Sequence, residues 1–296
     1  MEALADSIRA ELLARRLSNG CWSWAPDRCQ AALEPTCLAL LALRGVAQVP
    51  EPLLDRQLRD GSWPAFDGDA EPSGLTGLAL LTLGVLGAQG SYRQRAESWL
   101  VQTRGRESVW PWRWKFRTLD TAVRFDPGDF GWPWQPATCS WVVPTAFAVL
   151  ALKRSAALHR NPKIAHRLVC GVGMLLDRAC PGGGWNAGNG IVYGHAMLPH
   201  IDTTAIALLA LQGEPRAAIS DLSLRWLEQR IRACTSPWSL AWTILAFHVH
   251  ERKLDLLQDR LSLIAKTINE FDSATLAVAA LALDCTAANN PFRVRT

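Results

Sequence analysis

The sequence predicts an all-α protein: a single (α/α)6 barrel in which six outer helices surround six inner helices, with no sheet. Two observations predict this fold. Six loops rich in Trp and Gly, or remnants of such loops, each run into a stretch of small and aliphatic residues that opens with Pro, Ser, Thr or Asp. Six amphipathic segments alternate with these apolar stretches. A unit repeated on this scale buries its apolar face against its neighbours, so we expect residues 1–296 to form one toroidal domain.

The six inner helices are expected to begin at Ser or Thr residues that follow the loops. These residues are Thr36, Ser73, Thr145, Thr203, Ser236 and Ser273. Successive members of the set are 37, 72, 58, 33 and 37 residues apart. The residues after each are apolar on every side of a helix, which is typical of a helix buried all round. The 72-residue step is expected to contain a long loop and no missing unit.

The six outer helices are expected in segments that place apolar residues three to four positions apart among Arg, Asp, Glu and Gln. They span approximately residues 2–17, 51–59, 92–104, 162–178, 216–232 and 254–269. This pattern predicts one face in water and one against the inner ring. Two connecting loops, 105–141 and 180–201, are much longer than the others. Long ordered loops on a repeat ring are usually functional, so we expect any site at the end that they build.

Composition limits the classes of partner and the location. A formal net charge of +4 without a dense Lys/Arg block argues against nucleic acid. The eight Cys residues form no C-x-x-C pair, which favours reduced thiols and a cytoplasmic protein. The first residues carry acids where a signal peptide carries bases, and the longest apolar stretch, 75–88, is too short to cross a bilayer. We therefore expect a cytoplasmic protein, with peripheral contact to the inner membrane surface as an alternative.

Residues 106–117 are the densest mixture of basic and aromatic side chains in the chain. Trp and Arg together are typical of segments at a membrane interface. The same residues could contact a diphosphate or pack as a lid on the end of the barrel. All three interpretations stay open at the level of sequence.

Residues 57–63 read Gln-Leu-Arg-Asp-Gly-Ser-Trp, and several other loops keep the Gly and Trp of this pattern without the Gln. The pattern resembles the QxxxGxW repeat of the squalene and terpenoid cyclase and protein prenyltransferase superfamily. The resemblance covers nearly the whole chain. It implies an α/α barrel, in agreement with the helix count above, and says less about activity.

The resemblance to protein prenyltransferases can be tested against their zinc ligands, an Asp, a Cys and a His. The His lies three residues after a second Asp that opens an inner helix. Here Asp202 is followed at that spacing by Ala205, and Asp272 by Thr275. No Asp-x-Cys stands before a matching inner helix, and a catalytic zinc normally has three protein ligands. We therefore expect no metal, no cofactor and no zinc prenyltransferase activity.

Residues 200–205, His-Ile-Asp-Thr-Thr-Ala, resemble the acid motif of class II terpene cyclases. Asp202 matches the middle Asp of that motif and the following Thr-Ala is kept, whereas His200 and Thr203 replace the outer acids. The resemblance implies an enzyme that cyclises a polyprenyl or triterpene substrate, with Asp202 as general acid and His200 and Thr203 as its neighbours. A carbocation requires a dry cavity lined by aromatic rings. The expected substrate-binding residues are Trp141, Phe147, Trp238, Trp242, Trp112 and Trp185.

Alternative interpretations accompany these residues. Asp is a preferred N-cap, so Asp202 could serve only as a helix cap, and Asp272 is expected to do so. His195 and His200 could be hydrogen-bonded loop residues, and most loop Trp residues could be structural plugs. The chain has one barrel where many cyclases have a second domain, so a lid would come from the long loops or from a protein partner. The alternative function is a non-catalytic α/α toroid that binds an isoprenoid lipid or a protein partner.

Overall fold

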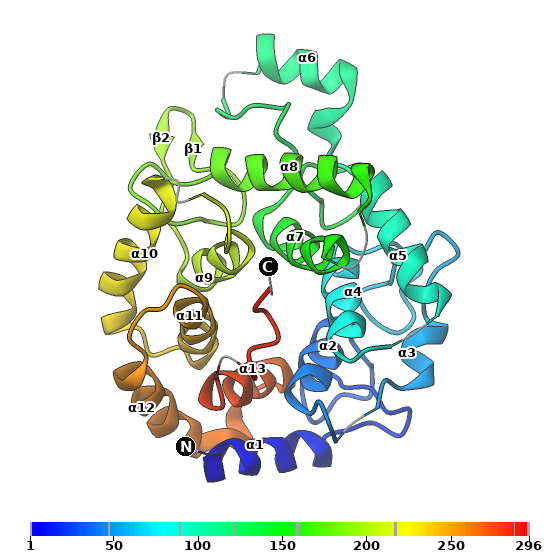
Figure 1. Ribbon diagram of the computed structural model, residues 1–296, viewed down its shortest axis with the longest axis vertical. Coiled ribbons are helices and arrows are strands. Elements are labelled where there is room, and N and C mark those ends of the chain that lie inside the picture. The colour runs from blue at the N-terminus through cyan, green and yellow to red at the C-terminus, as the bar shows by residue number, and fades with distance from the viewer. Residues whose placement is uncertain are drawn as a thin grey trace.

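The computed structural model describes residues 2–46, 48–88, 90–120, 122–157, 160–215, 218–286 and 288–294. Six inner helices form a ring (Figure 1): α2 (Leu33–Ala42), α4 (Thr76–Val85), α7 (Val142–Ala156), α9 (Ile201–Ala210), α11 (Pro237–Val249) and α13 (Ser273–Leu283). Each contacts the next along the chain, and α13 contacts α2. The predicted ring of inner helices is therefore present and closed.

The outer helices lie around this ring (Figure 1). They are α1 (Glu2–Ala14), α3 (Glu51–Asp55), α5 (Ser91–Gln102), α8 (Pro162–Asp177), α10 (Ala218–Arg230) and α12 (Asp255–Ile264). Short 3-10 turns η2 (Ile231–Ala233) and η3 (Ala265–Glu270) extend the last two. The inner helices are buried along almost their whole length, whereas the outer ones bury one face. This is the difference that the two hydrophobic patterns predict.

A repeated tryptophan staple joins outer and inner helices, and it explains the Gly-x-Trp pattern of the loops. Four fully buried indoles donate their N–H to a carbonyl at or near the end of the outer helix before them: Trp22 to Leu12, Trp63 to Leu53, Trp132 to Leu100 and Trp185 to Leu175. The backbone N–H of each of these Trp residues donates to a Thr hydroxyl of the following inner helix. The prediction that loop Trp residues act as plugs is confirmed for these four.

The Gln of the one complete motif has a structural role as well. The side-chain amide of Gln57 donates to the carbonyls of Gly61, at 2.9 Å, and Tyr92, at 2.8 Å. It thereby ties its own loop to the beginning of α5. Gly61 itself has φ +96°, and a Cβ there would lie 2.4 Å from the carbonyl oxygen of Arg95. Only Gly fits that turn.

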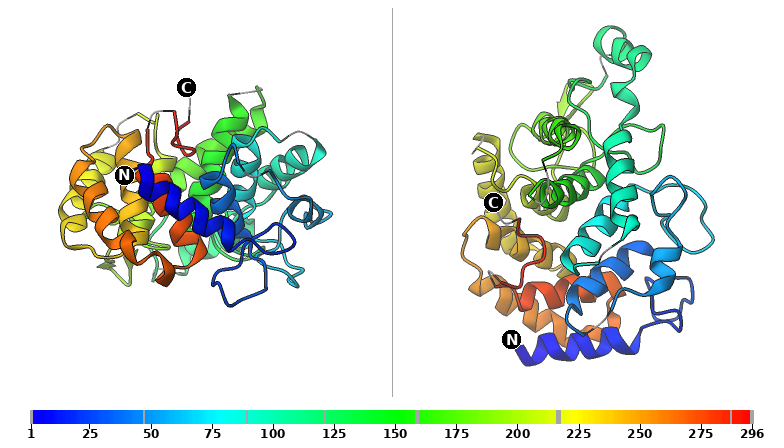
Figure 2. Two further views of the ribbon diagram at one scale, coloured as in Figure 1. Left: turned by 90° about the horizontal axis from the view of Figure 1, so that it is seen from below. Right: turned by 45° about the vertical axis from the view of Figure 1, so that its right-hand side comes forward.

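Two features depart from the predicted architecture. The loop 105–141 contains helix α6 (Trp110–Thr118), preceded by the turn η1 (Arg106–Ser108), and α6 stands out from the ring (Figures 1 and 2). The expectation of no sheet is wrong, because the structure contains one short hairpin. In it, β1 (Ile191–Val192) pairs antiparallel with β2 (His195–Ala196). Tyr193 and Gly194 at its turn have φ of 50° and 77°, as in the primed turns that connect hairpins. Strands of two residues are too short to show an alternating pattern in the sequence.

The end of the chain enters the ring (Figure 1). Phe292 is fully buried, and its carbonyl accepts a hydrogen bond from Gln212 at 2.8 Å. The backbone N–H of Val294 donates to the same Gln212 side chain, and the Asn290 amide donates to the carbonyl of Leu245. These contacts lie just after the end of α9 and in the second half of α11. The tail therefore closes the end of the ring at which the inner helices terminate.

Candidate functional site at the mouth of the ring

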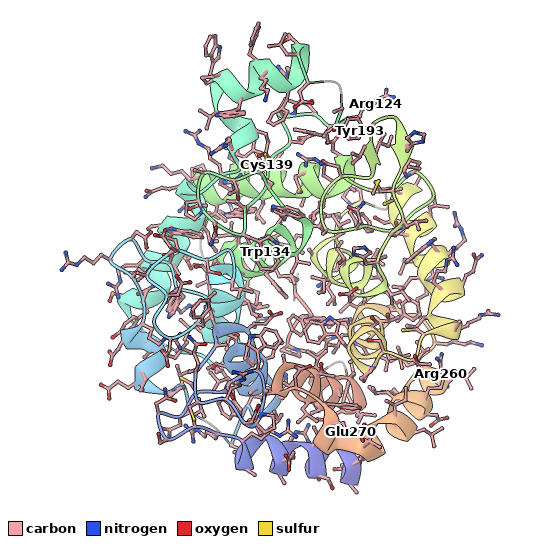
Figure 3. The ribbon with its side chains drawn as sticks, turned by 180° about the vertical axis from the view of Figure 1, so that it is seen from behind. Arg124, Trp134, Cys139, Tyr193, Arg260 and Glu270 are labelled. Atoms are coloured by element: carbon pink, nitrogen blue, oxygen red, sulfur yellow. The ribbon has the colours of Figure 1, made fainter. Side chains whose placement is uncertain are left out.

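The inner helices all begin at the opposite end of the ring, which we call the mouth. Backbone hydrogen bonds join the loops there: Leu33 donates to Ala65, Gly74 to Trp134, Val142 to Ala187 and Ser273 to Trp24. Figure 3 shows this end, with Trp134 labelled near the beginning of α7. Three of the loop tryptophans here, Trp24, Trp134 and Trp141, are exposed. The mouth thus offers apolar rings to a ligand.

Asp202 lies in the first turn of α9, at the mouth. His200 is the N-cap residue of α9, and its side chain makes no capping hydrogen bond. The partly buried Asp202 carboxylate accepts a hydrogen bond from the indole N–H of Trp238 at 3.3 Å. Among the described residues, no backbone N–H is bonded to this carboxylate. Its geometry is therefore that of a group turned toward the next inner helix.

Asp272 differs in its place, because it is the N-cap residue of α13, whereas Asp202 is the second residue of α9. The Asp272 carboxylate accepts from the backbone N–H of Thr275 at 2.8 Å and from the Thr275 hydroxyl at 2.6 Å. This is the predicted N-cap, and it uses both carboxylate oxygens. The two aspartates thus occupy different places at the start of their helices, and Asp202 is not the N-cap that the alternative interpretation expected.

An aromatic cluster continues from Asp202 into the ring. The rings of Trp238 and Trp242 meet edge to face at 5.6 Å, and Phe147 lies 6.0 Å from Trp242 on the other side. Phe292 of the tail packs against Trp242 at 5.0 Å. Trp242 is fully buried, and its indole N–H has no hydrogen-bond partner. The structure therefore places a carboxylate at one end of a stack of aromatic rings.

The other predicted site residues lie in different surroundings. Thr203 is buried in α9, and His200 is exposed to solvent beside it. Trp185 belongs to the staple described above and points toward α8, whereas Trp112 lies on the protruding α6. The structure thus brings Asp202 together with Trp238, Trp242 and Phe147, and it leaves Trp112 and Trp185 apart from them.

Sequence reasoning missed a second acid at the mouth. Glu34 lies in the first turn of α2, and burial raises the pKa of its carboxyl to about 7, with a smaller contribution from the charge of Asp272. Glu34 and Asp272 come from opposite ends of the chain and are near each other because α13 packs against α2. The sequence offers one signal for an acid at the mouth, which is the position of Glu34 beside Pro35 where an inner helix begins.

A pocket lies at the opposite end of the ring. It has a volume of about 840 Å³ and is lined by apolar residues of α7 and α8 together with Lys153, Glu214 and Arg293. The Lys153 ammonium is held by Glu214 at 2.7 Å and by two backbone carbonyls. Asp202 lines neither this pocket nor the two smaller ones described for the chain. Within the described ranges, no three His, Cys, Asp or Glu side chains are grouped so as to hold a metal ion.

The described residues contain no helix that could cross a membrane. No helix in the described part of the chain combines the length and the apolar character that a transmembrane span requires. Helix α8, at 16 residues, is the longest helix described and has one face against the ring.

Comparison with known proteins supports the fold. No family model matches the sequence, and no curated protein matches it. Among solved structures, the chain is similar to one described as a novel alpha-amylase from Clostridium perfringens. The two are 10% identical, with a TM-score of 0.63 over 95% of this chain and 97% of the other. At that identity the similarity shows a shared all-helical architecture and nothing about chemistry.

Proposed function

We propose that this protein is a class II terpene-cyclase-like enzyme, in which Asp202 protonates a polyprenyl or triterpene substrate at the mouth of the ring. The observation that carries the proposal is the contact between the Asp202 carboxylate and the Trp238 indole N–H, at 3.3 Å. Asp202 is the second residue of α9 and not its N-cap, whereas Asp272 is the N-cap of α13 and bonds its own helix. Asp202 instead bonds a side chain of α11.

The chemistry proposed for Asp202 is a proton transfer to carbon. The carboxylic acid gives its proton to one carbon of a terminal alkene or to an epoxide oxygen, and the other carbon becomes a cation. Further double bonds of the chain attack that cation in turn, closing rings. Loss of a proton from the final cation, or capture by water, ends the reaction. When the product forms by loss of a proton, the reaction is an isomerisation and needs no cofactor.

The neighbours of Asp202 fit both charged species of this reaction. The Trp238 N–H donates to the carboxylate that remains after proton transfer, which stabilises it relative to the acid. The positive end of the α9 dipole acts in the same direction. The faces of Trp238, Trp242 and Phe147 carry negative potential, which stabilises a nearby carbocation. Productive binding requires that a substrate chain enter between these rings from the mouth.

The test compares two Asp→Asn variants with the wild type. The proteins are incubated with farnesyl diphosphate, geranylgeranyl diphosphate, squalene and oxidosqualene, and the extracts are analysed by mass spectrometry. We expect a cyclised product from the wild type and from Asp272→Asn, because Asn also caps helices, and none from Asp202→Asn. A product that persists in Asp202→Asn would refute the proposed role of this residue.

The same incubation includes maltooligosaccharides, because the similar structure is described as an alpha-amylase. The mouth also carries exposed tryptophans and a Glu whose pKa is about 7, which are features compatible with a sugar ligand. Hydrolysis of the oligosaccharides, lost in Glu34→Gln and kept in Asp202→Asn, would replace the proposal with a glycosidase.

The second candidate function is the non-catalytic toroid that binds an isoprenoid lipid or a protein partner. One observation favours it: the middle of the ring is filled by Trp242, Phe147 and Phe292, all fully buried. Absence of product from every substrate above, together with binding of a labelled polyprenyl chain or of a protein, is the result that this alternative predicts.

A further inference from the structure

Helix α6 is an unusual element of this ring because none of its residues is buried. It projects beyond α8 at the rim of the molecule (Figures 1 and 2). Trp110 is 77% exposed and Trp114 is 53% exposed. The two are four positions apart in the helix and therefore share one face. Two large aromatic side chains stand side by side in solvent there, which is an uncommon arrangement unless something covers them.

The other face of α6 is fastened to the protein. Trp112 is covered by the guanidinium of Arg106, 4.7 Å from its ring, and Phe116 packs on Phe125 at 5.0 Å. These contacts fix the helix with its other face outward. Trp110 and Trp114, by contrast, take part in no aromatic or cation–π contact with the described residues. The exposed face is thus held in place by the contacts of Trp112 and Phe116 on the other face.

The hairpin β1–β2 adjoins the segment that follows α6. Val123 forms a bridge with Val192, and the backbone N–H of Arg124 donates to Ile191. Figure 3 shows Arg124 and Tyr193 next to each other at this place. Tyr193 is 76% exposed, and Leu198 just after the hairpin is 78% exposed. The hairpin thus places exposed side chains beside the segment that follows α6.

The charge of this region is positive on its outer side. Residues 106–126 contain five basic and three acidic side chains. One of the acids, Glu107, is fully buried against Arg178, with 3.6 Å between the Glu107 carboxylate and the guanidinium, and so does not face outward. The exposed Arg117 is paired with the exposed Asp126 at 3.1 Å, whereas Lys115 and Arg124 are exposed and belong to none of the ion pairs described.

We propose that the α6 surface, made of Trp110, Trp114, Tyr193, Leu198, Lys115 and Arg124, binds anionic lipid membranes and lies in their headgroup region. Trp and Tyr favour the membrane–water interface, and basic residues are attracted to anionic headgroups. The surface protrudes, and its residues line none of the pockets described above, so it suits a flat lipid layer better than an inserted peptide. The inference is independent of the role of Asp202.

The test measures partition of the full-length protein onto vesicles by sedimentation. The vesicles contain phosphatidylcholine alone or phosphatidylcholine with phosphatidylglycerol. We expect binding to the anionic vesicles that weakens with added salt. Trp110→Ser with Trp114→Ser, and separately Lys115→Gln with Arg124→Gln, should each lower the partition coefficient by at least about tenfold.

The matched control replaces two exposed leucines on another part of the ring. Leu256 and Leu263 of α12 are 80% and 62% exposed, so Leu256→Ser with Leu263→Ser removes a comparable apolar area. This variant should bind as the wild type does. Failure of the wild type to bind anionic vesicles would overturn the proposal, as would equal losses in the α6 and α12 variants. The variant of Lys115 and Arg124 keeps the test valid if the tryptophan variant does not fold.

Discussion

The tryptophan staple predicts that the buried hydroxyl of Thr76 contributes far more to the free energy of unfolding than the buried hydroxyl of Thr82 in the same helix. Thr76 is fully buried at the start of α4. Its Oγ1 accepts from the backbone N–H of Trp63 at 3.0 Å and donates to the carbonyl of Ser73 at 2.7 Å. Thr76→Val keeps the shape of the side chain and removes the acceptor. The Ser73 carbonyl keeps a partner, the backbone N–H of Thr76, whereas the Trp63 N–H keeps none. A buried donor left without a partner costs about 1–3 kcal/mol, so we expect a loss of roughly 2 kcal/mol in the free energy of unfolding.

Thr82→Val is the matched control for this substitution. Thr82 is also fully buried in α4, but its hydroxyl donates to the carbonyl of Leu78, one helical turn earlier. That carbonyl already accepts an ordinary helical hydrogen bond, so Val at this position orphans no backbone group. We expect a cost below about 1 kcal/mol. Urea unfolding followed by far-ultraviolet circular dichroism measures both values, with unchanged slopes. Equal costs for the two variants would refute the role assigned to the staple.

Three further predictions concern other parts of the ring. Between pH 4.5 and about 7 the folded state keeps a proton on Glu34 that the unfolded state has lost, because the pKa of Glu34 is raised in the folded state, so stability falls as pH rises through that window. Glu34→Gln should remove this pH dependence and add about 1–2 kcal/mol to the free energy of unfolding above pH 7. Unfolding curves at several pH values measure this, and an unchanged profile would contradict the prediction. Gly61→Ala places a Cβ 2.4 Å from the Arg95 carbonyl and should lower stability by more than about 2 kcal/mol in urea unfolding, so a near-neutral variant would contradict the tight turn. Burial raises the pKa of the Cys37 thiol to about 12, so mass spectrometry after brief alkylation should find the exposed Cys29 modified before Cys37; the opposite order would count against this core.

Much of the fold could be predicted because each repeat carries its own local signals. Apolar composition marked the inner helices, and three-to-four spacing marked the outer ones. Helix α6 was missed because Trp110, Trp112 and Trp114 alternate with other residues, whereas a buried helix face repeats every three to four. Its helix has no buried face at all, and so periodicity had nothing to detect.

The site depended on contacts between distant parts of the chain. Asp202 could be singled out by its motif, but the donor at its carboxylate, Trp238, lies on another repeat, and no spacing rule connects the two. Phe292 enters the aromatic cluster from a tail of polar residues that carries no repeat. Glu34 and Asp272 meet only because the ring closes. Such contacts follow from tertiary packing, which the sequence of a single repeat does not encode.

The central claim is that Asp202 delivers a proton to carbon or to an epoxide oxygen, and cyclisation of squalene in D2O tests it most directly. The carboxyl proton exchanges with solvent, so a product that starts by protonation of an alkene carries one deuterium at the carbon that Asp202 protonates. We predict this mass increase for the wild type and for Asp272→Asn, and no product for Asp202→Asn. A cyclised product without deuterium, or a deuterated product from Asp202→Asn, would contradict the account.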